Sequence, residues 1–75
     1  MVEQNRVQRS IAEHILWCRE ERERLATELA QFEAGTRSIG ARGPGEPVTQ
    51  GSLTRIAFLR RAIEELDAVI RAFAG

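Results

Sequence analysis

Apolar side chains recur along two stretches of the chain at helical spacing. In the first stretch the spacing alternates between four and three residues and is interrupted once, by Arg22; the apolar positions are Ile11, Ile15, Cys18, Leu25, Leu29 and Phe32. In the second stretch the same spacing is unbroken, through Ile56, Leu59, Ile63, Leu66, Ile70 and Phe73. These spacings gather side chains on one face of a helix. The pattern therefore predicts two amphipathic helices, over residues 3–34 and 52–74.

The residues at the ends of both stretches are typical of helix termini. Gly35 follows the first stretch at the position where a glycine cap is expected. Ser52 is the predicted N-cap of the second helix, with Thr49 as the alternative, because a hydroxyl oxygen accepts a hydrogen bond from a free amide of the first turn.

A Gly/Pro-rich segment, residues 35–51, separates the two helices. It holds five glycines and two prolines in seventeen residues. Proline lacks the amide hydrogen that a helix needs, and glycine loses much conformational entropy when it is fixed in a helix. Neither helix is therefore expected to continue through this segment. The segment is predicted to be a flexible loop, and its unusual length suggests that it is either mobile or functional.

Two helices that each carry one apolar stripe are expected to fold back on each other. A chain of 75 residues forms one domain, 1–75, with a small core, and its single cysteine excludes a disulfide framework. Self-association is then the simplest way to complete the core. The predicted fold is all-α, an antiparallel coiled-coil-like hairpin that dimerises into a four-helix bundle. The first helix is longer, so its start is left without a partner.

The charge pattern favours the antiparallel arrangement. Acidic and basic residues balance at eleven each, so no net positive field draws the chain to nucleic acid or to anionic lipid. Glu28 and Glu33 lie near the end of the first helix, and Arg55, Arg60 and Arg61 lie near the start of the second. Folding back brings the two groups together, although exposed pairs contribute only about 0.2–1 kcal/mol each.

Arg22 is the one charged residue within a predicted stripe. One interpretation is that its aliphatic stem packs while the guanidinium reaches solvent. The other is a buried ion pair with Glu64 or Glu65 that fixes the register of the two helices.

Three large apolar residues lie outside the stripes. Leu16 and Trp17 occupy heptad positions b and c of the first helix, and Phe58 occupies position c of the second. If only the two apolar stripes pack against each other, all three side chains remain in water. They therefore indicate a second interface, with Trp17 as its anchor. Scattered apolar surface residues are the simpler interpretation. A second copy of the chain is the preferred partner, ahead of a different protein.

His14 and Cys18 are four residues apart and share one helix face. This spacing suits two metal ligands, and a two-fold axis could assemble two such pairs around zinc. The simpler interpretation is that Cys18 behaves as a small buried apolar residue and that His14 flanks the stripe. No metal or other cofactor is therefore predicted.

Five arginines could contact nucleic acid or an acidic partner; they are Arg37, Arg42, Arg55, Arg60 and Arg61. Arginine binds phosphate and stacks on bases. However, the glycines around Arg37 and Arg42 form no phosphate-binding motif, and no strand precedes them.

The sequence also contains no arrangement typical of an enzyme. The chain has a single histidine that could activate a serine, and adjacent carboxylates such as Glu64 and Glu65 point in different directions from a helix.

No apolar run approaches the roughly 20 residues of a membrane span, and residues 1–6 do not resemble a secretory signal. We expect a cytoplasmic, non-enzymatic interaction module, an adaptor, regulator or inhibitor, that binds a protein. A nucleic-acid-binding regulator is the alternative, and a metal protein using His14 and Cys18 is the third choice.

Overall fold

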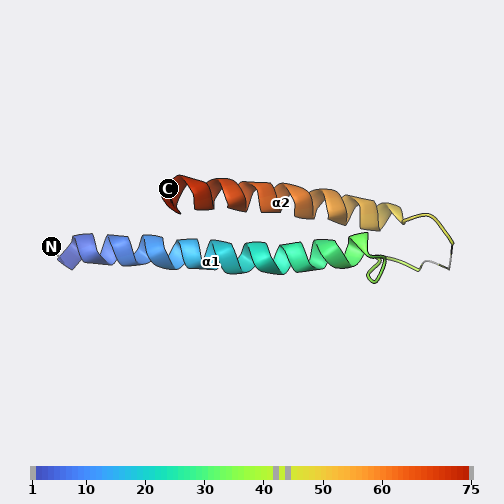
Figure 1. Cartoon of the computed structure of the whole chain (residues 1–75), viewed down its shortest axis with the longest axis horizontal. Helices are drawn as coiled ribbons and strands as arrows, with labels where there is room; N and C mark the ends of the chain where they lie inside the picture. Colours follow the sequence, from blue (N-terminus) through green and yellow to red (C-terminus); the bar gives the residue numbers. More distant parts are fainter. Residues whose placement is uncertain (1, 42, 44, 75) are drawn as a thin grey trace.

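The computed structural model describes residues 2–41, 43 and 45–74, with side chains described for these residues except 2–5, 7 and 74. Two helices, α1 (Val2–Glu33) and α2 (Gln50–Ala74), run antiparallel and pack side by side, and the described residues contain no strand (Figure 1). The molecule measures 61 × 16 × 15 Å. The prediction of an all-α helical hairpin is confirmed, with helix bounds that differ from the predicted ones by one or two residues.

The C-terminus of α1 is closed by a glycine cap, as predicted. Gly35 has a φ of 78°, a conformation that a residue without a Cβ adopts at little cost. The Gly35 amide donates to the Phe32 carbonyl at 3.2 Å, and the Thr36 amide donates to the Gln31 carbonyl at 3.0 Å. This pair of bonds is a Schellman motif, which satisfies carbonyls that the end of the helix leaves free.

The N-terminus of α2 is capped by Thr49, the alternative of the two predicted caps. The Thr49 hydroxyl oxygen accepts a hydrogen bond from the Ser52 amide at 3.1 Å, and the helix begins at Gln50, two residues before Ser52. The Ser52 side chain is buried and instead accepts a hydrogen bond from the Ile39 amide at 2.9 Å. The loop is thereby attached to the first turn of α2.

Gly51 provides the space for this attachment. A Cβ at position 51 would lie 2.9 Å from Cγ2 of Ile39, closer than side chains pack. The Thr49 hydroxyl also donates to the Ile39 carbonyl at 2.5 Å. Both backbone polar groups of Ile39 therefore find partners on side chains at the start of α2.

The core lies in the half of the hairpin nearest the loop. Leu25, Phe32 and Leu59 are buried and form one cluster, and the partly buried residues packed against it are Leu29, Ile56, Ala62, Ile63 and Leu66. All eight residues except Ala62 occupy the predicted stripes. The two stripes therefore form the seam of the hairpin here.

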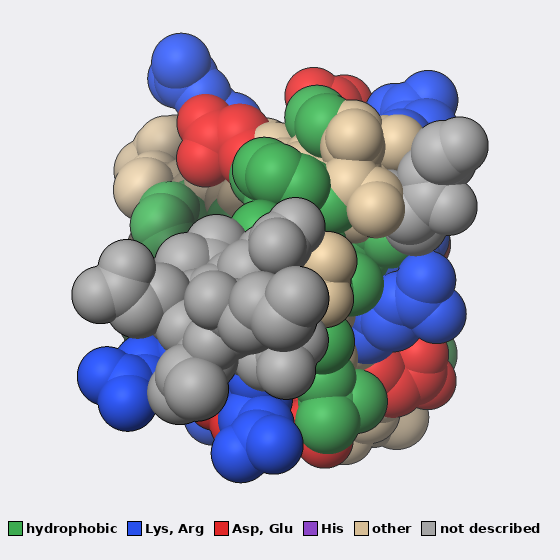
Figure 2. Space-filling view, turned by 90° about the vertical axis from the view of Figure 1, so that its left-hand side faces the viewer, with side chains coloured by type: hydrophobic (Ala, Val, Ile, Leu, Met, Phe, Trp, Pro, Cys, Tyr) green, Lys and Arg blue, Asp and Glu red, His purple; other side chains and the backbone are tan. Residues whose placement is uncertain are grey.

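The opposite end of the hairpin is open, because α1 extends beyond the last turn of α2 (Figure 1). Ile11 and Phe73 belong to the predicted stripes, yet both are exposed here, Phe73 by 61%. With Ile15 they line a cleft of about 410 Å³. Viewed from this end, apolar side chains reach the surface among charged ones (Figure 2). At this end, stripe residues of both helices therefore remain partly in water.

Three ion pairs join side chains of α1 to side chains of α2. Glu28 pairs with Arg55, and the Glu33 carboxylate lies 3.6 Å from Arg60, which confirms the predicted meeting of acids and bases at the loop end. No described helix is long and apolar enough to cross a membrane.

Arg22 pairs with Asp67, and not with Glu64 or Glu65 as the buried-pair interpretation required. The reason is geometric, since Asp67 flanks the seam of α2 at heptad position e, whereas Glu64 and Glu65 occupy outer positions. The Arg22 and Asp67 side chains are 39% and 34% exposed, so the pair stays in contact with solvent. The interpretation in which the guanidinium reaches solvent is the closer one.

Candidate functional site

A groove with an aromatic residue near each end runs along one side of the hairpin. We call it the Trp17–Phe58 groove; its volume is about 580 Å³, and its apolar lining also includes Leu25, Ala62 and Leu66. Trp17 is 54% exposed and Phe58 is 55% exposed. The groove thus combines two large, half-exposed aromatic rings with the outer edge of the core.

The heptad positions explain why these two aromatics share one side. Trp17 and Phe58 both occupy position c, next to the flank of the stripe that contains position g. In an antiparallel pair the g flanks of the two helices face the same side. The groove is therefore a consequence of the hairpin, because no local signal connects residues that are 41 positions apart in the sequence.

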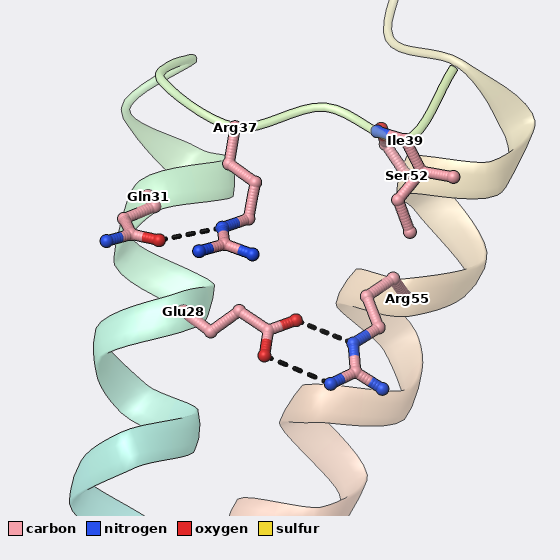
Figure 3. Close-up of polar contacts among 6 residues, drawn as sticks. All are labelled: Glu28, Gln31, Arg37, Ile39, Ser52 and Arg55. Carbon is pink, nitrogen blue, oxygen red and sulfur yellow. Dashed lines mark hydrogen bonds and ion pairs between the residues drawn. The ribbon is translucent and has the colours of Figure 1, made fainter.

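Arg55 organises the end of the groove at Phe58. Its Nε and Nη2 donate to the two carboxylate oxygens of Glu28 at 2.6 and 3.0 Å (Figure 3). Its guanidinium carbon also lies 5.0 Å from the centroid of the Phe58 ring, within cation–π distance. The hydrogen bond from Arg55 lowers the pKa of Glu28 below its ordinary value and raises that of Arg55. One side chain thus holds an acid across the seam and contacts an exposed ring.

His14 supports the indole at the other end. The rings of His14 and Trp17 are stacked, with centroids 6.1 Å apart and planes inclined by 13°. The other neighbour of His14 is the buried thiol of Cys18, whose Sγ lies 3.7 Å from Nε2. His14 and Cys18, whose spacing suits two metal ligands although no metal is predicted, are therefore in contact, and the described residues contain no group of three or more side chains that could hold a metal ion. Of this pair, His14 stacks on Trp17.

Leu16 lies apart from the other two predicted interface residues. It is 57% exposed and lines a different cleft of about 490 Å³, together with Ile11, Ile15 and Phe73. Positions b and c project to opposite flanks of the stripe, so adjacent residues can serve opposite sides of a hairpin. The structure brings Trp17 and Phe58 together and separates them from Leu16.

The described candidate arginines do not form one basic surface. Arg55 and Arg60 pair with acids of α1, and Arg61 lies 3.6 Å from Glu65 of its own helix. Arg37 donates to the side-chain oxygen of Gln31 at 2.7 Å (Figure 3). Arg42 lies outside the described residues. The carboxylates beside Arg55, Arg60 and Arg61 lower the positive potential that a phosphate would meet there, which weakens the case for a nucleic-acid surface.

Two features of this region were not predicted from the sequence. The contact between Arg55 and Phe58 had a usable signal, because residues three apart are neighbours on a helix. The attachment of Ile39 to Ser52 had none, since the path of the loop decides which backbone amide reaches the Ser52 hydroxyl. Comparison of the chain with protein-family models, with curated proteins and with solved structures finds no match.

Proposed function

We propose that the protein is a non-enzymatic interaction module, an adaptor, regulator or inhibitor in the cytoplasm, that binds another protein and also self-associates. Its hairpin completes a four-helix bundle as a homodimer, and the Trp17–Phe58 groove is its principal binding surface. The single observation that carries the proposal is that two half-exposed aromatic side chains from different helices line one groove with an apolar floor.

Burial of these rings would provide a strong driving force. Fully burying an exposed large apolar side chain contributes about 1.5–3 kcal/mol, and each of these half-exposed rings can gain about half of that. Tryptophan is also enriched among the residues that dominate interface energies. The polar rim of the groove consists of Glu21, Arg24, Glu28 and Arg55. An apolar floor inside a charged rim is the usual composition of a protein–protein interface.

The proposal is tested by a matched pair of substitutions at neighbouring positions. Trp17 and Leu16 are exposed to nearly the same extent, 54% and 57%, but they serve opposite sides of the hairpin. We expect Trp17→Ala to lower the mass measured by light scattering while helix content by circular dichroism stays the same. Leu16→Ala should leave both unchanged. A Trp17→Ala variant with the wild-type mass would contradict the proposed role of the groove.

A further inference from the structure

We propose that the cleft of about 410 Å³ at the open end of the hairpin binds a single-chain amphiphile with a carboxylate head group, of the class of fatty acids. The carboxylate lies at Arg6, and the hydrocarbon chain runs towards Phe73. We call this site the open-end cleft; its described lining residues are Arg6, Ser10, Ile11, His14, Ile15 and Phe73. It shares no described lining residue with the Trp17–Phe58 groove, so the inference goes beyond the proposed function.

The open-end cleft has an apolar floor and an apolar end wall. Ile11 and Ile15 of α1 form the floor, and Phe73 in the last turn of α2 forms the wall. The cleft lies where α2 ends and α1 continues, so a bound chain occupies the place that further turns of α2 would fill (Figure 1). Its volume is within the range of roughly 300–1,000 Å³ that is usual for small-molecule sites. A hydrocarbon chain here would remove the exposed surfaces of Ile11 and Phe73 from water.

The polar side of the open-end cleft carries a positive charge. Arg6 is the one charged residue among the described residues that line the cleft. Its side chain is exposed and forms no ion pair with any described side chain, whereas Arg55 and Arg60 hold carboxylates of α1. Ser10 follows Arg6 by four residues and therefore shares its side of the helix. A carboxylate at this position would accept charge-assisted hydrogen bonds from the guanidinium, with a hydroxyl beside it.

The charge and the aromatic wall lie at opposite ends of the open-end cleft, which fixes the orientation of the ligand. Arg6 precedes Ile15 by nine residues, a distance of about 13 Å along a helix. An extended chain such as that of decanoate or dodecanoate has a comparable length. The start of α1 carries a partial positive charge and the end of α2 a partial negative one, so the two helix dipoles favour the same orientation, with the anionic head at Arg6.

The head group is tested with two amphiphiles that share one chain and carry opposite charges. Dodecanoate and dodecyltrimethylammonium are titrated into the full chain below their micelle-forming concentrations, and binding is measured by isothermal titration calorimetry. We expect one dodecanoate per chain and at least about tenfold weaker binding of the cation. Equal affinities would overturn the preference for a carboxylate. The absence of dodecanoate binding would overturn the site itself.

The contact with Arg6 is tested by a matched pair of charge removals. Arg6→Gln should weaken the binding of dodecanoate by about tenfold and should not weaken the binding of the cation. Arg9→Gln is the control, since Arg9 is an exposed arginine of the same helix that is not among the lining residues. It should leave the affinity for dodecanoate unchanged. If both variants lose affinity equally, the anion is attracted by overall charge, and the contact with Arg6 is wrong.

The location is tested by two phenylalanines of similar exposure, Phe73 at 61% and Phe58 at 55%. Phe73→Ala should weaken both amphiphiles, because it removes the wall that either chain contacts, while circular dichroism shows unchanged helix content. Phe58→Ala changes the Trp17–Phe58 groove and should leave dodecanoate binding as in the wild type. The opposite result, a loss with Phe58→Ala and none with Phe73→Ala, would place the ligand in the groove and overturn the open-end cleft as its site.

Discussion

The two ends of the hairpin are built differently. At the loop end, a Schellman motif closes α1, Thr49 caps α2, and Ser52 holds the backbone of Ile39. Two ion pairs also cross the seam at this end. At the open end, α1 extends past α2, and Ile11 and Phe73 are exposed although they belong to the apolar stripes.

This difference concentrates the contacts that hold the hairpin together in the loop half, which also contributes Leu25 and Phe58 to the Trp17–Phe58 groove. The loop half contains the buried cluster around Leu59, and the helix caps and two of the ion pairs lie in the same half. The open end and the Trp17–Phe58 groove keep large apolar side chains in water. In a chain this small, burying this exposed apolar area against a partner would favour binding.

The largest expected effect on stability comes from creating a cavity in the core of the loop half. Leu59 is completely buried, so Leu59→Ala should lower the free energy of unfolding by about 2–5 kcal/mol. Phe73→Ala at the open end removes a larger side chain that is 61% exposed and should cost less than about 1 kcal/mol. Urea denaturation at one fixed protein concentration measures both. If Leu59→Ala and Phe73→Ala lower the free energy of unfolding equally, the two ends do not differ in packing as described.

A smaller effect is expected at the cap of α2. Thr49→Ala removes the acceptor for the Ser52 amide and the donor to the Ile39 carbonyl, and should destabilise the protein by about 1 kcal/mol. Thr27→Ala is the control, because its exposed hydroxyl only donates to the Glu23 carbonyl within α1. Thermal unfolding should show a lower midpoint for Thr49→Ala alone. Matching midpoints for the two variants would show that the cap does not anchor the loop end.

The smallest effect concerns pH. The hydrogen bond from Arg55 lowers the pKa of Glu28 from an ordinary value of 4.5. The folded state therefore favours the carboxylate, and the stabilisation is complete above pH 4.5 and is lost as pH falls through the lower folded-state pKa. Wild type should exceed Glu28→Gln in stability near neutral pH, and the difference should shrink in acid.

Glu13→Gln is the control at the open end, because Glu13 makes no ion pair with any described side chain. Its difference from wild type should not depend on pH in the same way. The measurement should run from about pH 3 to about pH 7, an interval that includes the ordinary pKa values of carboxylates. If the stability difference between wild type and Glu28→Gln stays constant over this interval, the protonation of Glu28 is not linked to folding.

Much of the fold follows from the order of residues along the chain. The spacing of apolar residues determined both helices, Gly35 marked the end of the first, and opposite charges at Glu28 and Arg55 indicated the antiparallel direction. These features are local or repeat with the period of the helix, so they can be read without knowing what lies opposite each residue.

The tertiary structure decided which residues meet and which remain exposed. It assigned Asp67 to Arg22, placed Trp17 and Phe58 on one side and Leu16 on the other, and attached Ile39 to Ser52. The pair of Arg22 with Asp67 depends on the axial register of the helices, and the attachment of Ile39 depends on the path of the loop. Both arise only when the helices pack, because a stripe specifies a face and leaves open which residue of the partner lies across from it.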